Sequence, residues 1–137
     1  MKNKKRNKTI KHVFFGLVIG VIALIGIWQL LSFQKRIQQA QQREKVALWC
    51  VQNLKGPKIK EIKVGKLVKN GLDGTGGASI DVQINDKQRN IIELTVDSGD
   101  LEPSGGAFDE KSEYILVQNP YKNKNLNGIK VEQWRNH

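Results

Sequence analysis

The sequence predicts an α+β chain with an N-terminal transmembrane helix and a helical stalk, followed by one helix packed on an antiparallel β-meander of four to five strands. Three observations lead to this prediction. Residues 13–33, VFFGLVIGVIALIGIWQLLSF, carry no formal charge, and as a helix they would span roughly 31 Å, close to the hydrocarbon thickness of a bilayer. Residues 34–45 are mostly polar helix formers. After Pro57, the spacing of apolar residues changes from about 3.6 to 2, which is typical of strands.

The distribution of charge favours a membrane surface over nucleic acid. The net charge is +10, yet from Lys58 onward twelve basic and twelve acidic residues cancel. Residues 1–12 hold six Lys and Arg and no acid. Because the excess positive charge flanks the apolar run, we expect anionic lipid headgroups as a partner and no nucleic acid. The positive-inside rule then predicts a single-pass protein of the cell membrane, with a cytoplasmic N-terminus and an extracellular C-terminal domain.

The N-terminal part divides into a tail and an anchor. Residues 1–12 form a basic cytoplasmic tail to which no structure is assigned. Residues 13–33 form the transmembrane helix, and no small-x-small cleavage site follows it, so we expect an uncleaved signal anchor. Within it, Gly16 and Gly20 form a GxxxG pattern. This pattern either lets two helices dimerise or reflects the frequency of glycine in membrane helices.

The next segments lead from the anchor into the folded domain. Residues 34–45, QKRIQQAQQREK, are polar on nearly every side and predict an exposed helical stalk. The extracytoplasmic α+β domain begins at residue 46, where VALWCV indicates a buried helix that includes Trp49. Lys55, Gly56 and Pro57 predict the end of this helix, with Gly56 as its left-handed cap.

Alternating apolar residues predict five strands in the domain of residues 46–137. Short connections favour sequential antiparallel pairing, so the sheet is expected to be a meander whose apolar face is covered by the helix. Residues 98–112 are expected to form one long, Gly-rich acidic loop. The expected strands are residues 59–68 with a bulge at Gly65, 78–84, 92–97, 113–118 and 129–134.

The stretch from Gly76 to Gly106 resembles a family of short, uncharacterised, membrane-anchored proteins of streptococci and other lactic-acid bacteria, a domain of unknown function. The resemblance implies an N-terminal membrane segment and a place in a Gram-positive envelope, and it implies no activity. More loosely, a helix followed by an antiparallel meander is similar to cystatin-like domains. The residues that carry the resemblance are Gly76, Gly77, Val82, Ile84, Asn85, Asp86, Leu101, Glu102, Ser104, Gly105 and Gly106.

The sequence offers no constellation for catalysis. The only histidines, His12 and His137, are expected on opposite sides of the membrane, so no histidine dyad or zinc site forms within one chain. Cys50 lies in the predicted buried helix, where a small core residue is the expected role. We therefore expect a protein that is not an enzyme and holds no cofactor or metal.

One polar cluster is a candidate contact loop. Its acids are opposed within the same stretch by Lys111 alone. Three states stay open: the loop binds a hard cation such as Ca²⁺, meets a basic partner, or is simply solvated. The acids are Asp97, Asp100, Glu102, Asp109, Glu110 and Glu113.

These features predict a single-pass, membrane-anchored extracytoplasmic binding or accessory domain, with a protein partner at the cell envelope. The alternative is a subunit of an envelope secretion, conjugation or pilus-like apparatus. Pilin-type signals place a glutamate a few residues into the apolar run, and residues 13–33 contain none.

Overall fold

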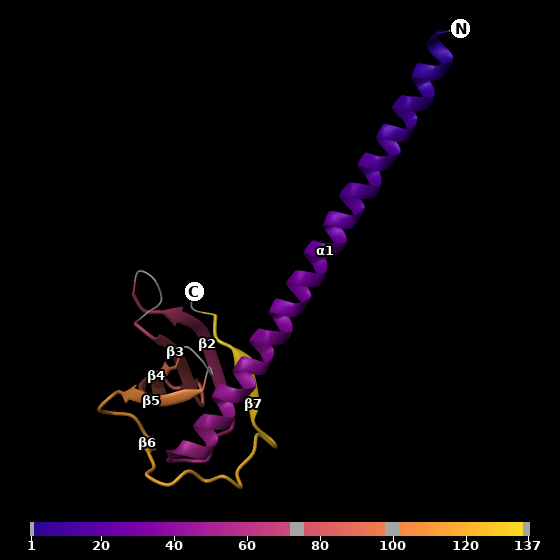
Figure 1. Cartoon of the computed structure of the whole chain (residues 1–137). Helices are drawn as coiled ribbons and strands as arrows, with labels where there is room; N and C mark the ends of the chain where they lie inside the picture. Colours follow the sequence, from indigo (N-terminus) through magenta and orange to yellow (C-terminus); the bar gives the residue numbers. More distant parts are fainter. Residues whose placement is uncertain (1, 72–75, 98–101, 136–137) are drawn as a thin grey trace. The chain divides into compact units, whose positions relative to one another are not determined.

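The computed structural model describes residues 2–71, 76–97 and 102–135, with side chains from residue 8 onward (Figure 1). It contains one long helix, a five-stranded mixed sheet and a two-stranded sheet, which confirms the α+β class. The chain separates into two compact units, Met1–Gln39 and Ala40–His137.

Helix α1 runs without interruption from Lys2 to Asn53. This confirms that the helix of the apolar run continues through residues 34–45 and into the folded domain. The prediction of an unstructured tail at residues 1–12 is wrong, since α1 already includes them from Lys2 onward. Lys and Arg are good helix formers, and no Gly or Pro precedes Gly16, so the apolar helix can extend backward.

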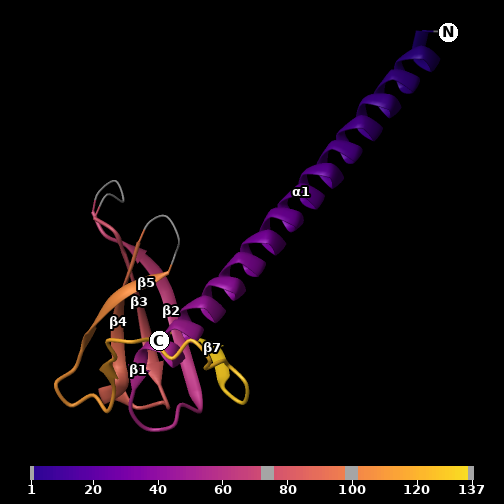
Figure 2. The same ribbon diagram turned by 60° about the horizontal axis from the view of Figure 1, so that its bottom comes forward.

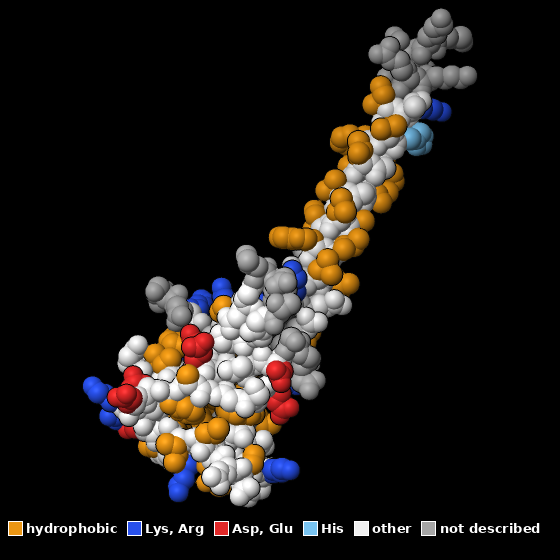
Figure 3. Space-filling model, turned by 60° about the vertical axis from the view of Figure 1, so that its left-hand side comes forward, with side chains coloured by type: hydrophobic (Ala, Val, Ile, Leu, Met, Phe, Trp, Pro, Cys, Tyr) orange, Lys and Arg blue, Asp and Glu red, His pale blue; other side chains and the backbone are white. Residues whose placement is uncertain are grey.

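In the first unit, the apolar side chains of α1 point outward on every side of the helix. Phe14, Leu24 and Trp28 are 69%, 69% and 74% exposed, and Figure 3 shows such side chains along the helix. In the part of the chain that the structure describes, α1 is the one helix long and apolar enough to cross a membrane, and none of its most apolar window is buried.

The main sheet of the second unit has the strand order β5-β4-β3-β2-β7 (Figures 1 and 2). Strands β2, β3 and β4 pair antiparallel in sequence, as predicted, and β5 adds to the free side of β4 in antiparallel fashion. A register irregularity in β2 between Val64 and Leu67 confirms the bulge around Gly65. The strands are β2 (Glu61–Lys69), β3 (Ala78–Ile84), β4 (Ile91–Val96), β5 (Pro103–Phe108) and β7 (Lys130–Gln133).

Two strand predictions need correction. Residues 103–108 form strand β5 on the edge of β4, whereas residues 98–112 were expected to form one loop. The last strand, β7, pairs parallel to β2, so the sheet is not a complete meander. The connection between β5 and β7 is long, so the chain can cross to the opposite edge of the sheet. Parallel pairing requires such a crossover, whereas a short hairpin allows only antiparallel pairing.

The predicted strand at residues 113–118 is also wrong in length and partner. Only Ile115–Leu116 is a strand, β6, and it pairs antiparallel with β1, Leu54–Lys55, directly after α1. A short 3₁₀ helix, η1 (Gln88–Asn90), connects β3 to β4.

The core of the second unit lies between the last turns of α1 and one face of the sheet. Trp49 and Cys50 are 9% and 0% exposed, which confirms the predicted buried helix and the core role of both residues. The buried apolar residues are Val46, Ala47, Trp49, Cys50, Val51, Leu54, Ile62, Val64, Ala78, Ile80, Val82, Ile84, Ile92, Leu94, Val96 and Tyr114.

Tyr114 explains why a glycine follows the helix. A Cβ on Gly56 would lie 2.5 Å from Cδ1 of Tyr114 and 2.6 Å from the carbonyl oxygen of Glu113. Among the residues that the structure describes, the glycines with positive φ are Gly71, Gly77 and Gly128, so the prediction of a left-handed cap at Gly56 is wrong. Gly56 instead makes room for a buried ring, and α1 ends at Asn53, just before the predicted Lys-Gly-Pro stop.

Candidate functional site

Strand β5 separates the acids of the candidate contact loop. Asp97 follows β4 and Glu102 precedes β5, whereas Asp109 and Glu110 follow β5 at its other end. All four of these acids are exposed. Asp100 lies outside the described residues. The acids therefore flank an edge strand instead of sharing one loop.

Glu113, the last of the predicted acids, is engaged with basic and amide groups of the η1 region. Its carboxylate accepts hydrogen bonds from Lys87 Nζ at 3.0 Å and from Asn90 Nδ2 at 2.8 Å, and it pairs with Arg89. Its backbone N–H donates to Oδ1 of Asn90 at 3.0 Å. The hydrogen bonds from Asn90 and Lys87 lower the pKa of the Glu113 carboxyl below its usual 4.5.

Asn90 is 0% exposed, although it is a polar residue. Burial of an amide is stable only when its hydrogen bonds are satisfied, and the Glu113 backbone and carboxylate supply both partners. This exchange ties the start of β4 to the segment before β6. Lys87 and Arg89 oppose Glu113 from outside the sequence stretch that was considered for the contact loop, so Glu113 serves the fold and is not a free contact acid.

Asn85 and Tyr114 form a second polar anchor nearby. Asn85 adopts a positive φ of 55°. Its Oδ1 accepts from the backbone N–H of Lys60 at 2.7 Å, and its Nδ2 donates to Oη of Tyr114 at 3.0 Å. Tyr114 Oη in turn donates to the carbonyl of Pro57 at 3.2 Å. Because asparagine tolerates the left-handed region, it can hold this turn and its neighbours together.

A pair of carboxylates that the sequence analysis missed lies on the outer face of the sheet. Asp81 on β3 is directly opposite Glu93 on β4, and both are exposed. Partial burial, and secondarily the Glu93 charge, raise the pKa of Asp81 above its usual 3.8. Strand register is the signal that would have found this pair, since both acids alternate with buried residues.

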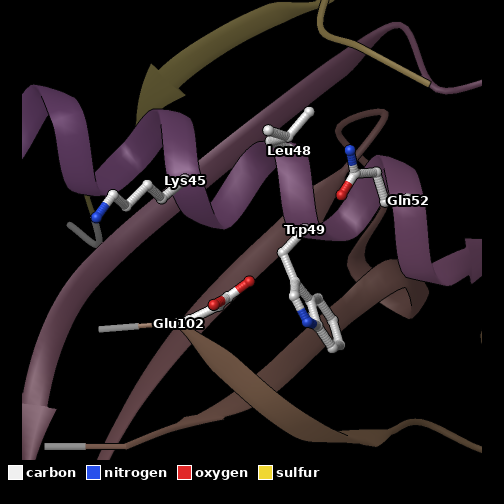
Figure 4. A pocket seen from close by; sticks show the side chains of 5 residues that line it. All are labelled: Lys45, Leu48, Trp49, Gln52 and Glu102. Atoms are coloured by element: carbon white, nitrogen blue, oxygen red, sulfur yellow. The ribbon is translucent and has the colours of Figure 1, made fainter. Parts of the chain in front are cut away.

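An open hollow of about 310 Å³ lies beside α1 in the second unit (Figure 4). Figure 4 shows the indole of Trp49 reaching from α1 and the carboxylate of Glu102 reaching from the chain that enters β5. Lys45, Leu48 and Gln52 complete its lining. An aromatic wall with charged groups at its rim can receive an amphipathic side chain.

A second hollow, of about 410 Å³, lies between the segment around Pro57 and residues 123–129. Its walls mix apolar groups such as Ile59 and Ile129 with asparagines and lysines. Gln52 Nε2 donates to the Lys124 carbonyl at 3.2 Å, which fastens this segment to the end of α1.

Most of the remaining predicted positions lie on α1. Cys50 is buried, and burial raises the pKa of its thiol to about 12. His12 is exposed on α1, and His137 lies outside the described residues. In residues 2–71, 76–97 and 102–135, no group of three or more His, Cys, Asp or Glu side chains is arranged to hold a metal ion. Gly16 and Gly20 lie one turn apart on α1, with open space where each Cβ would be.

Comparison of the chain with protein-family models, with curated proteins and with solved structures found no match. The resemblance of residues 76–106 to a membrane-anchored family therefore stays a prediction.

Proposed function

We propose that this chain is a single-pass membrane protein whose residues 13–33 cross the bilayer and whose folded domain, on the outer side, binds a partner as an accessory and not as an enzyme. The observation that carries the proposal is the exposure of a charge-free apolar helix on all its sides. Leu17, Ile22 and Leu30 are 60–64% exposed. Transfer of so much apolar surface from water into hydrocarbon is strongly favourable.

The backbone of this segment suits a bilayer as well. A spanning segment must satisfy its own N–H and C=O groups, and a continuous α-helix does so. Residues 13–33 lie wholly within α1, Lys2–Asn53. Trp28, near one end of the run, fits the aromatic belt found at membrane interfaces.

Charge asymmetry supports the orientation. The six Lys and Arg of residues 1–12 outweigh the basic residues that follow closely after Phe33. The positive-inside rule then favours a cytoplasmic N-terminus and an extracytoplasmic domain. The absence of a small-x-small motif after residue 33 supports an anchor that stays uncleaved.

The arrangement of the domain supports binding in preference to catalysis. Its single thiol, Cys50, is buried and has a raised pKa, so it is a poor nucleophile. The hollow beside Trp49 and the acids around β5 are features of recognition surfaces. We infer a cystatin-like layout only for the end of α1 with β2–β5, since β7 pairs parallel to β2.

Thiol labelling of intact cells tests the proposal. The variants Ser104→Cys and Asn3→Cys, each with one added cysteine, are treated with a membrane-impermeant maleimide, and the unmodified chain, whose native Cys50 is buried, gives the background of labelling. We expect labelling at position 104 and none at position 3 until the cells are permeabilised. Labelling of position 3 alone would mean that the orientation in the membrane is the opposite of the one proposed. Recovery of the chain in the soluble fraction would contradict the proposed membrane anchor.

A further inference from the structure

One edge of the main sheet is open. Strand β5 (Pro103–Phe108) is the terminal strand and pairs with β4 along one side. Along its other side, no segment of the described chain pairs with it. Such an edge presents a row of N–H and C=O groups that can pair with another strand.

The two edges of this sheet differ in their protection. The opposite edge, β7, has four residues, and its Lys130 and Glu132 form an ion pair at 2.5 Å. Short length and charge are the usual means by which edges avoid pairing with other chains. Strand β5 has six residues, PSGGAF, without a charge, and its one proline is its first residue. The β5 edge therefore lacks the devices that protect β7.

Small side chains leave the β5 edge accessible. A Cβ at Gly105 would meet no atom within 4 Å, and Ala107 is exposed. An added strand would lie about 4.8 Å away, with alternate side chains on the two faces of the sheet. On the inner face they would approach the hollow lined by Trp49 and Glu102. On the outer face, Ala107 is directly opposite Glu93 of β4, so a long basic side chain can reach over it.

The charged residues at the two ends of this edge are mostly acidic, and the basic residues nearby are Lys111, directly after Glu110, and Lys45 in the lining of the hollow. Glu102 precedes β5, and Asp109 and Glu110 follow it, each of them exposed. Asp97 directly follows β4, whose last residue, Val96, pairs with Pro103 at the start of β5. Electrostatic complementarity then selects a basic ligand.

We propose that the free edge of β5 binds an extended, basic segment of a partner protein by strand addition, with alternate lysine or arginine side chains facing the surrounding acids. This inference rests on the binding role proposed above and names the surface and the class of partner. Backbone pairing supplies affinity in such complexes, and the alternate side chains supply specificity.

Binding of a model peptide tests the proposal. The full chain, in nanodiscs of zwitterionic phosphatidylcholine, is titrated with acetyl-Lys-Val-Lys-Val-Lys-Val-amide, and empty nanodiscs serve as the blank. We expect saturable binding that weakens as salt rises, together with slower amide hydrogen exchange in residues 103–108. A peptide with glutamate in place of lysine should bind at least about tenfold more weakly.

Two N-methylated isomers of the peptide distinguish strand addition from simple charge attraction. One is methylated at the lysine amides and the other at the valine amides, and in an extended strand only one of these sets faces β5. We expect one isomer to lose binding and the other to keep it. Equal binding of both isomers overturns strand pairing.

Protein variants locate the site. Ala107→Lys adds a charge of the kind that protects sheet edges and should weaken binding about tenfold, whereas Gln118→Lys adds the same charge outside β5 and should not. Protection that appears on β7 instead of β5 overturns the proposed site. Absence of any binding overturns the inference, while the membrane topology measured by thiol labelling is unaffected by either result.

Discussion

Residues 13–33 and residues 46–51 are two apolar parts of the same helix with opposite surroundings. Leu24 is 69% exposed, whereas Val46 and Cys50 are 0% exposed. Both parts have the composition of buried helix. The second part has a sheet of its own unit to pack against, and the first has no apolar partner in the described residues of its unit. The difference teaches that the first part requires an apolar environment from outside the chain, and a bilayer of matching thickness supplies it.

The largest expected effect comes from two charges introduced in the middle of residues 13–33, the exposed part of the helix. In Ile22→Arg with Leu24→Arg, each arginine costs about 2.5–3.5 kcal/mol near the centre of a spanning helix. We expect the protein to leave the membrane fraction, while the melting temperature of the folded domain stays unchanged. Ile22→Val with Leu24→Val is the matched control and should stay with the membrane. Melting that shifts with the arginine pair would mean that these residues support the folded domain.

Trp49→Ala tests the buried part. Loss of a large aromatic side chain from a packed core destabilises by about 3–5 kcal/mol, and this change should lower the melting temperature without releasing the protein from membranes. The control is Trp28→Ala in the exposed part, where we expect almost no change in melting. Thermal unfolding of both variants in the same detergent measures the difference. A cost below about 1 kcal/mol for Trp49→Ala would place Trp49 at an interface and not in the core.

A pH-dependent effect is expected at Glu113. Its pKa is lowered in the folded state, so between the two pKa values the unfolded state binds more protons and stability rises with pH. The stabilisation is fully present well above pH 4.5 and is lost as the pH falls through the lower folded-state value. Glu113→Gln should therefore melt below wild type at pH 7, with a difference that shrinks below pH 4.5. A difference that is constant across this range contradicts the ion-pair role.

The smallest effect concerns the two carboxylates on the outer face of the sheet. Like charges directly opposite each other on antiparallel strands destabilise by about 0.2–1 kcal/mol. The pKa of Asp81 is raised first by partial burial and then by the Glu93 charge. Glu93→Gln should raise the melting temperature slightly at pH 7, and the gain should fade as Asp81 becomes protonated at acidic pH. Glu110→Gln removes a charge without an opposed carboxylate and serves as the control. Equal gains from both variants would attribute the effect to net charge.

Local patterns predicted much of this fold. The apolar run, the buried segment around Trp49 and the strands at residues 78–84 and 91–96 follow from periodicity, because each element buries one face. The bulge near Gly65 was also predictable, since glycine inside a strand pattern signals one. These features depend on neighbours in the sequence.

Features that depend on distant residues were not predictable. Strand β5 has little alternation, because Gly105 and Gly106 carry no side chain, so its pattern indicated a loop. Gly106 is small because Leu94 on the next strand lies 3.0 Å from where its Cβ would be. The parallel pairing of β7 and the contacts of Glu113 with Lys87 and Arg89 likewise arise from tertiary placement. The acids of the candidate site were visible in the sequence, whereas the edge strand between them was not.

The central claim is that residues 13–33 reside within a bilayer, and extraction of membranes at alkaline pH tests it most directly. Membranes from cells that express the full chain are washed in sodium carbonate, which releases proteins held by charge or by partner proteins and leaves integral proteins in the pellet. The account predicts that the chain stays in the pellet and enters solution only with detergent. Release of the chain by carbonate alone would contradict it, and would mean that another protein covers the apolar surface of α1.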